Sequence, residues 1–175
     1  MIRLYHISEE PGIECFEPRP SPQRYSSLRG DVVFAISEEM LHLYLTPRDC
    51  PRVCYMAGPD TSERDRMDFL GQSPIVMAVE AGWRPALRET VLYCYELPSE
   101  GFELLDASAG YYVSYQVVQP LSVTAISHPL GALAARGVQV EFVADLWSVA
   151  EEVSRSSLRF SCIRMRNAGG RDTIL

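Results

Sequence analysis

Leu4-Tyr5-His6-Ile7-Ser8 is the stretch from which the fold can be argued. Its aromatic and β-branched residues are typical of a strand, and so is the apolar run DVVFAI at residues 31–36. Side chains alternate along a strand, so Tyr5 and His6 are expected on opposite sides of it. The chain is therefore predicted to open with two strands.

Outward from these strands, the sequence predicts a mixed pattern of short elements. Further strands are expected at residues 52–55, 75–79, 90–97, 102–105, 111–118, 123–126, 138–143 and 158–165. Four short helices are expected at residues 38–45, from the Asp60-Thr61-Ser62-Glu63 capping box to Gly71, at 130–136 and at 146–153. Strands and helices do not alternate regularly, so we expect an α+β fold with two packed, mainly antiparallel sheets and short flanking helices. No linker or repeat divides the sequence, which predicts one domain over residues 1–175.

A long loop is expected from Pro18 to Gly30. Prolines 18, 20 and 22 are incompatible with regular structure there. Loops of this length in compact domains often bind ligands, although disorder is equally allowed. The sequence leaves both alternatives open.

The charge balance limits the partners. The 175 residues carry 16 basic and 23 acidic side chains, a net charge of −7, and all 16 basic residues are arginines. The sequence has no cluster of basic residues, so general binding to nucleic acid is not expected. The absence of lysine excludes a lysine Schiff base and a phosphate-loop lysine. Prolines break the long uncharged stretch at residues 110–135, and the N-terminus resembles no secretory signal, so we expect no membrane span and a cytoplasmic protein.

The cysteines and histidines show no metal-binding pattern. Five cysteines, at 15, 50, 54, 94 and 162, and three histidines, at 6, 42 and 128, lack zinc-site spacing, so no metal is expected. Reduced, structural cysteines are the first interpretation. A cysteine–histidine catalytic pair stays an alternative, although the sequence does not say which residues would pair.

Three short motifs stand in a definite order along the chain. The first is Leu4-Tyr5-His6-Ile7-Ser8, and the second is Phe34-Ala35 followed by Tyr44 on the next helix. The third is Gly110-Tyr111-Tyr112-Val113-Ser114-Tyr115. Over residues 2–126 this order resembles the ADP-ribosyltransferase fold of the diphtheria-toxin and poly(ADP-ribose) polymerase type. That family has an L-[YW]-H-G-[ST] strand, a [YF]-[FY]-A strand followed by a tyrosine, and an N-E-Y-x-V-Y strand.

The resemblance implies roles for individual residues in binding NAD. His6 would hydrogen-bond a ribose hydroxyl, and Ser8 would line the same cleft. The backbone of Ile7, which stands where the family has glycine, would hold the nicotinamide carboxamide. Tyr44 would stack on the nicotinamide ring. The implied reaction is transfer of ADP-ribose to an acceptor with release of nicotinamide.

Two arginines are candidates for the diphosphate of such a ligand. Arg19 lies in the proline-rich loop, and Arg48 follows Pro47. A guanidinium can bind a phosphate in bidentate fashion. Because arginine is the only basic residue type in the chain, an ordinary surface role is the alternative.

The third motif departs from the family at its catalytic position. Tyr111 stands where the family has a glutamate, whose charge stabilises the oxocarbenium-like centre that forms when the glycosidic bond breaks. A phenol, with an ordinary pKa near 10, does not supply that charge. His6, Tyr44 and Tyr111 are thus the candidate catalytic residues, and Glu80, Glu96 and Glu141 are candidates for a replacement acid.

Other functions stay open at this point. One alternative is a non-catalytic member of the same fold that binds a nucleotide or a protein. Another is an RNA-end enzyme like the tRNA 2′-phosphotransferases, against which the acidic balance argues. The chain also resembles an uncharacterised bacterial family of unknown function. Its recurring stretches correspond to Tyr5-His6-Ile7-Ser8-Glu9-Glu10, Pro47-Arg48-Asp49-Cys50-Pro51-Arg52 and Arg164-Met165-Arg166-Asn167.

Overall fold

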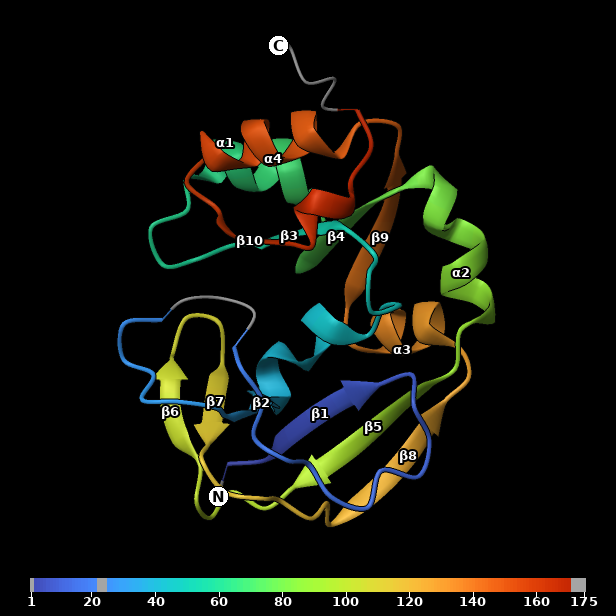
Figure 1. Ribbon diagram of the computed structural model, residues 1–175. Helices are drawn as coiled ribbons and strands as arrows, with labels where there is room; N and C mark the ends of the chain where they lie inside the picture. Colours follow the sequence, from blue (N-terminus) through green and yellow to red (C-terminus); the bar gives the residue numbers. More distant parts are fainter. Residues whose placement is uncertain (1, 22–24, 171–175) are drawn as a thin grey trace, which may run out of the picture. The chain divides into compact units, whose positions relative to one another are not determined.

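The computed structural model describes residues 2–21 and 25–170 (Figure 1). Its strands are β1 (Leu4–Ser8), β2 (Val33–Ser37), β3 (Arg52–Met56), β4 (Ile75–Glu80), β5 (Leu92–Leu97), β6 (Glu103–Asp106), β7 (Tyr111–Ser114), β8 (Ser122–Ile126), β9 (Val138–Val143) and β10 (Arg159–Ile163). Its α-helices are α1 (Glu63–Asp65), α2 (Arg84–Glu89), α3 (Pro129–Ala135) and α4 (Leu146–Ser154). Short helices of other types are η1 (Glu38–Tyr44), η2 (Arg66–Leu70), η3 (Ala81–Trp83) and η4 (Met165–Asn167).

The chain divides into two compact units, each built from two separate stretches. Met1–Leu45 and Val91–Ser127 form the first, which we call the six-stranded unit. Thr46–Thr90 and His128–Leu175 form the second, which we call the four-stranded unit. The prediction of one domain over residues 1–175 stays a prediction.

The six-stranded unit is an antiparallel sheet with the strand order β6-β7-β2-β1-β5-β8. The central strand β1 pairs with β5 from Leu4 to Ser8. One face of the sheet carries a hydrophobic cluster of buried residues: Leu4, Phe16, Val33, Ala35, Tyr95, Leu97 and Val118. Phe16 reaches this cluster from outside the strands, held by a bridge between its backbone and Val118. The sheet therefore buries the face that contains Leu4.

The helix that follows β2 is tighter than the sequence predicts. Residues 38–45 were expected to form an ordinary helix, but Glu38–Tyr44 is a 3₁₀-helix with Leu41, His42 and Leu43 buried. Ser37 occupies the N-cap position, yet its side chain makes no capping hydrogen bond. A 3₁₀-helix has three residues per turn, so its buried side chains do not follow the α-helical spacing used for the prediction.

The four-stranded unit has the strand order β10-β3-β4-β9, in which β4 and β9 are the parallel pair. Helix α4 packs its apolar side against β3 and β4 through Leu146 and Val153, both fully buried. Asp145 caps this helix by accepting hydrogen bonds from the backbone of Trp147 and Ser148. A second cluster, around Val79 and Leu87, lies where α2 and α3 meet the sheet. The short helices thus complete the core of this unit.

The predicted fold class is confirmed as α+β, with two mainly antiparallel sheets and short helices. Some elements differ from the prediction. No helix was expected between the predicted strands at residues 75–79 and 90–97, but helix α2 lies there, with a proline in its first turn, where proline is tolerated. The predicted helix ending at Gly71 is one α-turn followed by a π-turn, and its cap is Ser62, which accepts from the backbone N–H of Asp65 at 3.1 Å. Strand β7 ends at Ser114, earlier than expected.

Acidification is expected to destabilise the protein through two aspartates of the four-stranded unit. Hydrogen bonds from the side chain and backbone of Ser157 lower the pKa of Asp65 below its ordinary 3.8, and those of Ser148 do the same for Asp145. A carboxyl with a lowered pKa in the folded state stabilises the fold when ionised, so this contribution is present above its ordinary pKa and is lost as the pH falls through the lowered value. Urea unfolding at pH 6 and pH 3 measures the loss.

The controls for this prediction are single substitutions. Asp65→Asn and Asp145→Asn should each reduce the difference in stability between the two pH values. Asp60→Asn should leave the difference unchanged, because the described residues form no hydrogen bond with the Asp60 carboxylate. An unchanged difference in both test variants would contradict the assignment.

Candidate functional site

Strands β1 and β2 form a fork. Within the described residues they pair only at Leu4–Ser37 and Tyr5–Ile36, whereas β1 continues beside β5 as far as Ser8. The two strands therefore separate after Tyr5, in the middle of a six-stranded sheet. At such a gap, backbone N–H and C=O groups of the two inner strands lack the hydrogen bonds that normally pair neighbouring strands.

The backbone of Ile7 faces this fork. The carbonyl of Arg3 accepts from the N–H of Glu38 at 3.2 Å, so Arg3 directs its backbone groups toward the β2 side of β1. Backbone groups alternate along a strand, and therefore Tyr5 and Ile7 are directed to the same side. Tyr5 pairs with Ile36, but Ile7 lies past the end of that ladder. Its N–H and C=O thus line the fork.

The ring of His6 is held at the edge of the fork. Its Nδ1 lies 3.1 Å from the carbonyl oxygen of Phe34 on β2. A carbonyl only accepts, so Nδ1 carries a proton in this contact. The ring of Phe16 packs against His6 with a centroid distance of 4.7 Å. Both contacts fix the orientation of the imidazole.

Tyr44 and Tyr111 meet although 67 residues separate them in the sequence. Tyr44 ends η1, and Tyr111 begins β7. Their hydroxyl oxygens lie 2.5 Å apart in a hydrogen bond, and their ring centroids are 6.2 Å apart. Phe34 contacts Tyr111 edge-on, with the ring centroids 6.4 Å apart. The second and third motifs of the sequence are therefore in direct contact.

His6 lies on the other face of the sheet from this tyrosine pair. Residues paired directly across an antiparallel ladder share a face. His6 pairs with Tyr95 and so lies on the buried face, whereas Tyr111 pairs with Ile36, which pairs with Tyr5. Phe34 connects the two sides, because its carbonyl accepts from His6 and its ring contacts Tyr111.

Two aromatic residues at this site were not predicted. Phe34 was identified only as part of a motif, although its position two residues before Ile36 already places it on the face of Tyr111. Tyr25 lies in the proline-rich loop; burial, and then the neighbouring Tyr111, raise the pKa of its phenol. No periodic pattern in that loop could have identified it.

The remaining predicted ligand-binding residues are dispersed. The hydroxyl of Ser8 accepts from the backbone N–H of Glu10 at 3.0 Å. Arg19 pairs through its backbone with Val32, and its side chain is exposed. Arg48 belongs to the four-stranded unit. Of the two predicted diphosphate ligands, Arg19 alone lies in the same unit as His6.

The candidate replacement acids have structural partners. Glu96 accepts from the guanidinium of Arg3 at 3.0 Å, which lowers the pKa of this glutamate. Glu80 accepts from the backbone N–H of Gly169, and Glu141 accepts from Gln139. Both belong to the four-stranded unit. Of these three carboxylates, only Glu96 shares a unit with Tyr111, and it is engaged by Arg3.

The cysteines are free thiols, and those near the start of β3 are deeply buried. Burial raises the pKa of Cys50 and of Cys54 to about 12, so both are protonated at neutral pH. A thiol rather than a thiolate is a poor nucleophile. This environment favours a structural role for both. In the described residues, no group of three or more histidine, cysteine or acidic side chains is arranged to hold a metal ion.

Two of the recurring stretches meet in the four-stranded unit. The side-chain amide of Asn167 donates to the carbonyl of Asp49 at 2.7 Å. Arg52, on the same stretch as Asp49, is almost completely buried and donates to the carbonyl of Cys50 at 2.8 Å. The bond between Asn167 and Asp49 gives both stretches a role in joining η4 to the segment that precedes β3.

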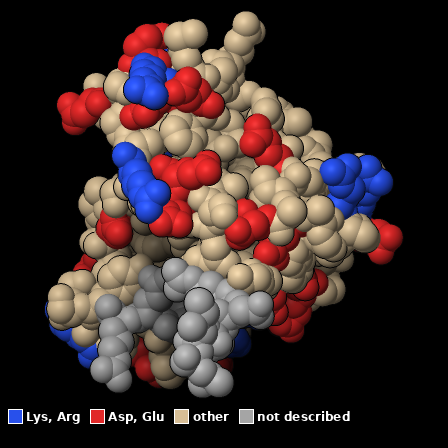
Figure 2. Space-filling model, turned by 90° about the horizontal axis from the view of Figure 1, so that it is seen from above, with Lys and Arg blue, Asp and Glu red and all other residues tan. Residues whose placement is uncertain are grey.

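The surface charge follows the composition. On the face seen in Figure 2, arginines lie in separate spots among more widespread acidic side chains. The basic side chains on this face are therefore not gathered into one patch. Across residues 2–21 and 25–170, no helix combines the length and apolar character needed to cross a membrane.

Comparisons with known proteins identify a family. A search of the curated proteins and a search of the solved structures each found no match. A protein-family model, described as a family of unknown function (DUF6886), matches residues 5–168. The match covers β1 from Tyr5 onward, all of β2, η1 and β7, and every candidate site residue. The chain belongs to the family of unknown function DUF6886.

Proposed function

We propose that the six-stranded unit binds NAD or a related ADP-ribose nucleotide at the fork between β1 and β2. The observation that carries this proposal is the fork itself, which presents the backbone N–H and C=O of Ile7 beside the ring of His6. A carboxamide has one acceptor and two donors, so it matches a paired N–H and C=O. The resemblance of the three sequence motifs to ADP-ribosyltransferases supports the same ligand.

In this proposal the aromatic residues hold the nicotinamide ring on the face that carries Tyr111. Tyr44 stacks on the ring, which contributes about 1 kcal/mol beyond burial. The hydrogen bond to Tyr111 keeps the Tyr44 phenol in place before the ligand arrives. A ribose hydroxyl that enters the fork beside Ile7 would meet the ring of His6 at the edge of the fork, where the Phe34 carbonyl holds that ring.

We further propose that the site binds its ligand with little or no transfer. Cleavage of the bond between nicotinamide and ribose needs a negative group beside the developing oxocarbenium centre. Tyr111 instead offers a hydroxyl that is hydrogen-bonded to Tyr44. Glu96, in the same unit, is neutralised by its ion pair with Arg3. A nucleotide-binding function therefore fits the residues better than an efficient transferase does.

A thermal-shift measurement tests the binding proposal. NAD at about 100 times its Kd should stabilise the protein by about 2.7 kcal/mol. Tyr44→Ala and His6→Ala should each reduce the shift strongly, since one removes the stacking ring and the other the ribose contact. His128→Ala is the matched control, because His128 is exposed and lies in the four-stranded unit. A full shift in both test variants, or tighter binding of a 2′-phosphorylated RNA end than of NAD, would contradict the proposal.

The Tyr111→Glu variant tests the role assigned to Tyr111. Nicotinamide released from NAD should be at the background level in the natural protein and should rise at least tenfold in the variant, since one well-placed carboxylate contributes several kcal/mol to a charged transition state. Tyr111→Gln is the control, because the glutamine side chain is similar in size to glutamate and carries no charge. Rapid release by the natural protein would overturn the assignment of binding without transfer.

A further inference from the structure

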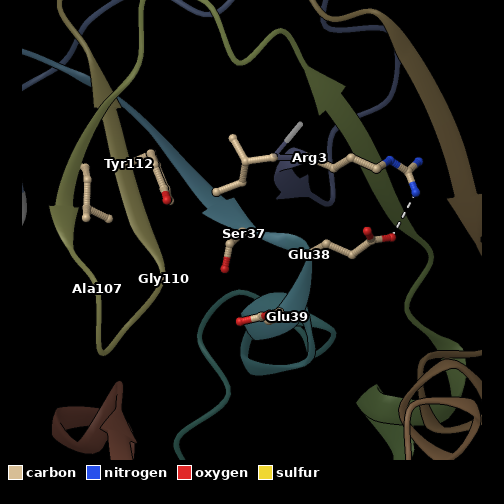
Figure 3. A pocket seen from close by; sticks show the side chains of 9 residues that line it. Arg3, Ser37, Glu38, Glu39, Ala107, Gly110 and Tyr112 are labelled. Carbon is tan, nitrogen blue, oxygen red and sulfur yellow. Dashed lines mark hydrogen bonds and ion pairs between the residues drawn. The ribbon is translucent and has the colours of Figure 1, made fainter.

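A second candidate site lies at the junction of β2, η1 and β7 in the six-stranded unit. A pocket with a volume of about 320 Å³ is formed there by Ser37, Glu38, Glu39, Gly110 and Tyr112, together with Leu104, Ala107 and the N-terminal residues Ile2 and Arg3 (Figure 3). This volume is at the lower end of the range of pockets that hold small molecules. The pocket therefore suits a ligand group about the size of one long side chain.

The hydroxyl of Ser37 is the first sign of a ligand. Ser37 is only 8% exposed, and its side chain points into the pocket (Figure 3). It occupies a helix N-cap position without making the capping bond, and among the described residues its hydroxyl has no hydrogen-bond partner. Although most of the residue is buried, the hydroxyl is not one of the fully buried polar atoms that lack a partner, so it is accessible from the pocket and can bond a donor or acceptor of a ligand there.

The charge of the pocket favours a cation. Arg3 is held by Glu38 at 2.9 Å and by Glu96 at 3.0 Å, so its charge is already compensated. Glu39 is exposed, and its carboxylate forms no ion pair with the residues that the structure describes. The pocket is lined by one guanidinium and by the carboxylates of Glu38 and Glu39, which gives its walls a net charge of −1.

The walls of the pocket are apolar and open to water. Leu104 is 55% exposed and Ile2 is 44% exposed, and the ring of Tyr112 adds to this surface. An aliphatic stem would cover these side chains while its polar end reached Ser37 and Glu39. Because the walls are exposed, the rest of such a ligand can remain outside the pocket.

We propose that this pocket binds a guanidinium group on an aliphatic chain, as in an arginine side chain. The planar guanidinium has several N–H donors and can bond the Glu39 carboxylate and the Ser37 hydroxyl together, which the compact ammonium of lysine does less well. The proposal is independent of nucleotide binding at the fork, since it uses none of the residues assigned there.

The test is a titration of the full chain with N-acetyl-arginine N-methylamide, followed by the amide chemical shifts of Ser37, Glu39 and Gly110. N-acetyl-citrulline N-methylamide, which is neutral and nearly the same shape, is the ligand control. The arginine compound should produce saturating shifts, and the citrulline compound should bind at least tenfold more weakly. Ser37→Ala and Glu39→Gln should each weaken arginine binding about tenfold, the effect of losing one charged hydrogen bond.

A control variant and a comparison of two ligands complete the test. Glu100→Gln removes one exposed charge from the same unit outside the pocket, and it should change binding less than twofold. Tighter binding of a capped Ala-Arg-Ala peptide than of agmatine would assign arginine in a polypeptide, and the reverse order would assign a small guanidine. Equal binding of arginine and citrulline compounds, or unchanged binding in both pocket variants, would overturn the proposal.

Discussion

Replacing Tyr95 with alanine is expected to lower the free energy of unfolding by about 3–5 kcal/mol, the usual cost of removing a fully buried aromatic ring. Tyr95 is 1% exposed, and its ring contacts Phe16 edge-on at 5.3 Å. Its hydroxyl donates to the carbonyl of Glu10 at 2.8 Å and accepts from the N–H of Ile13 at 3.1 Å. The residue thus joins β5 to the segment that follows β1.

The Tyr95→Phe variant separates the hydroxyl from the ring. It keeps the buried ring and removes both hydrogen bonds, so we expect a loss of about 1 kcal/mol. Amide exchange at Ile13 should become faster in this variant. Urea unfolding measures the loss in free energy of unfolding in Tyr95→Ala and in Tyr95→Phe. A loss below 1 kcal/mol in Tyr95→Ala would show that the segment at residues 10–16 is held by other contacts.

Gly110→Ala is the second change with a large expected effect, a loss of about 2–4 kcal/mol. Gly110 has a φ of +68°, which disfavours any side chain and contributes about 1 kcal/mol. A Cβ there would also lie 2.5 Å from the hydroxyl oxygen of Ser37 and 2.7 Å from Cγ of Met40. Relieving such overlap in a packed region costs about 1–3 kcal/mol more.

Gly101→Ala is the matched control for this prediction. Gly101 lies in the same unit with a φ of +79°, but the nearest atom to an added Cβ is 4.0 Å away. This variant should therefore lose only the conformational part, about 1 kcal/mol. Thermal or urea unfolding compares the two. Equal losses in both would show that Ser37 and Met40 move aside without cost.

Several strands could be predicted from the sequence for a physical reason. Short runs such as residues 31–36 and 138–143 are rich in β-branched residues and are bounded by turn residues, so local preference and tertiary structure agree. The resemblance implied one site for His6, Tyr44 and Tyr111; the structure brings the two tyrosine hydroxyl groups into contact and places His6 on the other face of the sheet.

Features that depend on which strands pair, and in which register, could not be predicted from the sequence. The alternation at β1 shows that His6 and Tyr5 point in opposite directions, but only the ladder through Ile36 decides that Tyr111 lies on the side of Tyr5. The fork likewise depends on where β1 and β2 separate, and no local pattern marks that point. Helix α2 was not predicted, although a proline in the first turn, as in this helix, is compatible with a helix start.

The path of the chain between the two units has a consequence for synthesis on the ribosome. The two parts of the six-stranded unit are separated in the sequence by residues 46–90, which belong to the four-stranded unit. The two parts of the four-stranded unit are separated by residues 91–127, which belong to the six-stranded unit. A nascent chain that ends at residue 90 would carry β1 and β2 without β5 and β7, and β3 and β4 without β9 and β10. The six-stranded sheet could not be complete before Ile126 had been translated, and the four-stranded sheet not before Ile163. A fragment cut at residue 90 should therefore fold only when the complementary fragment is supplied.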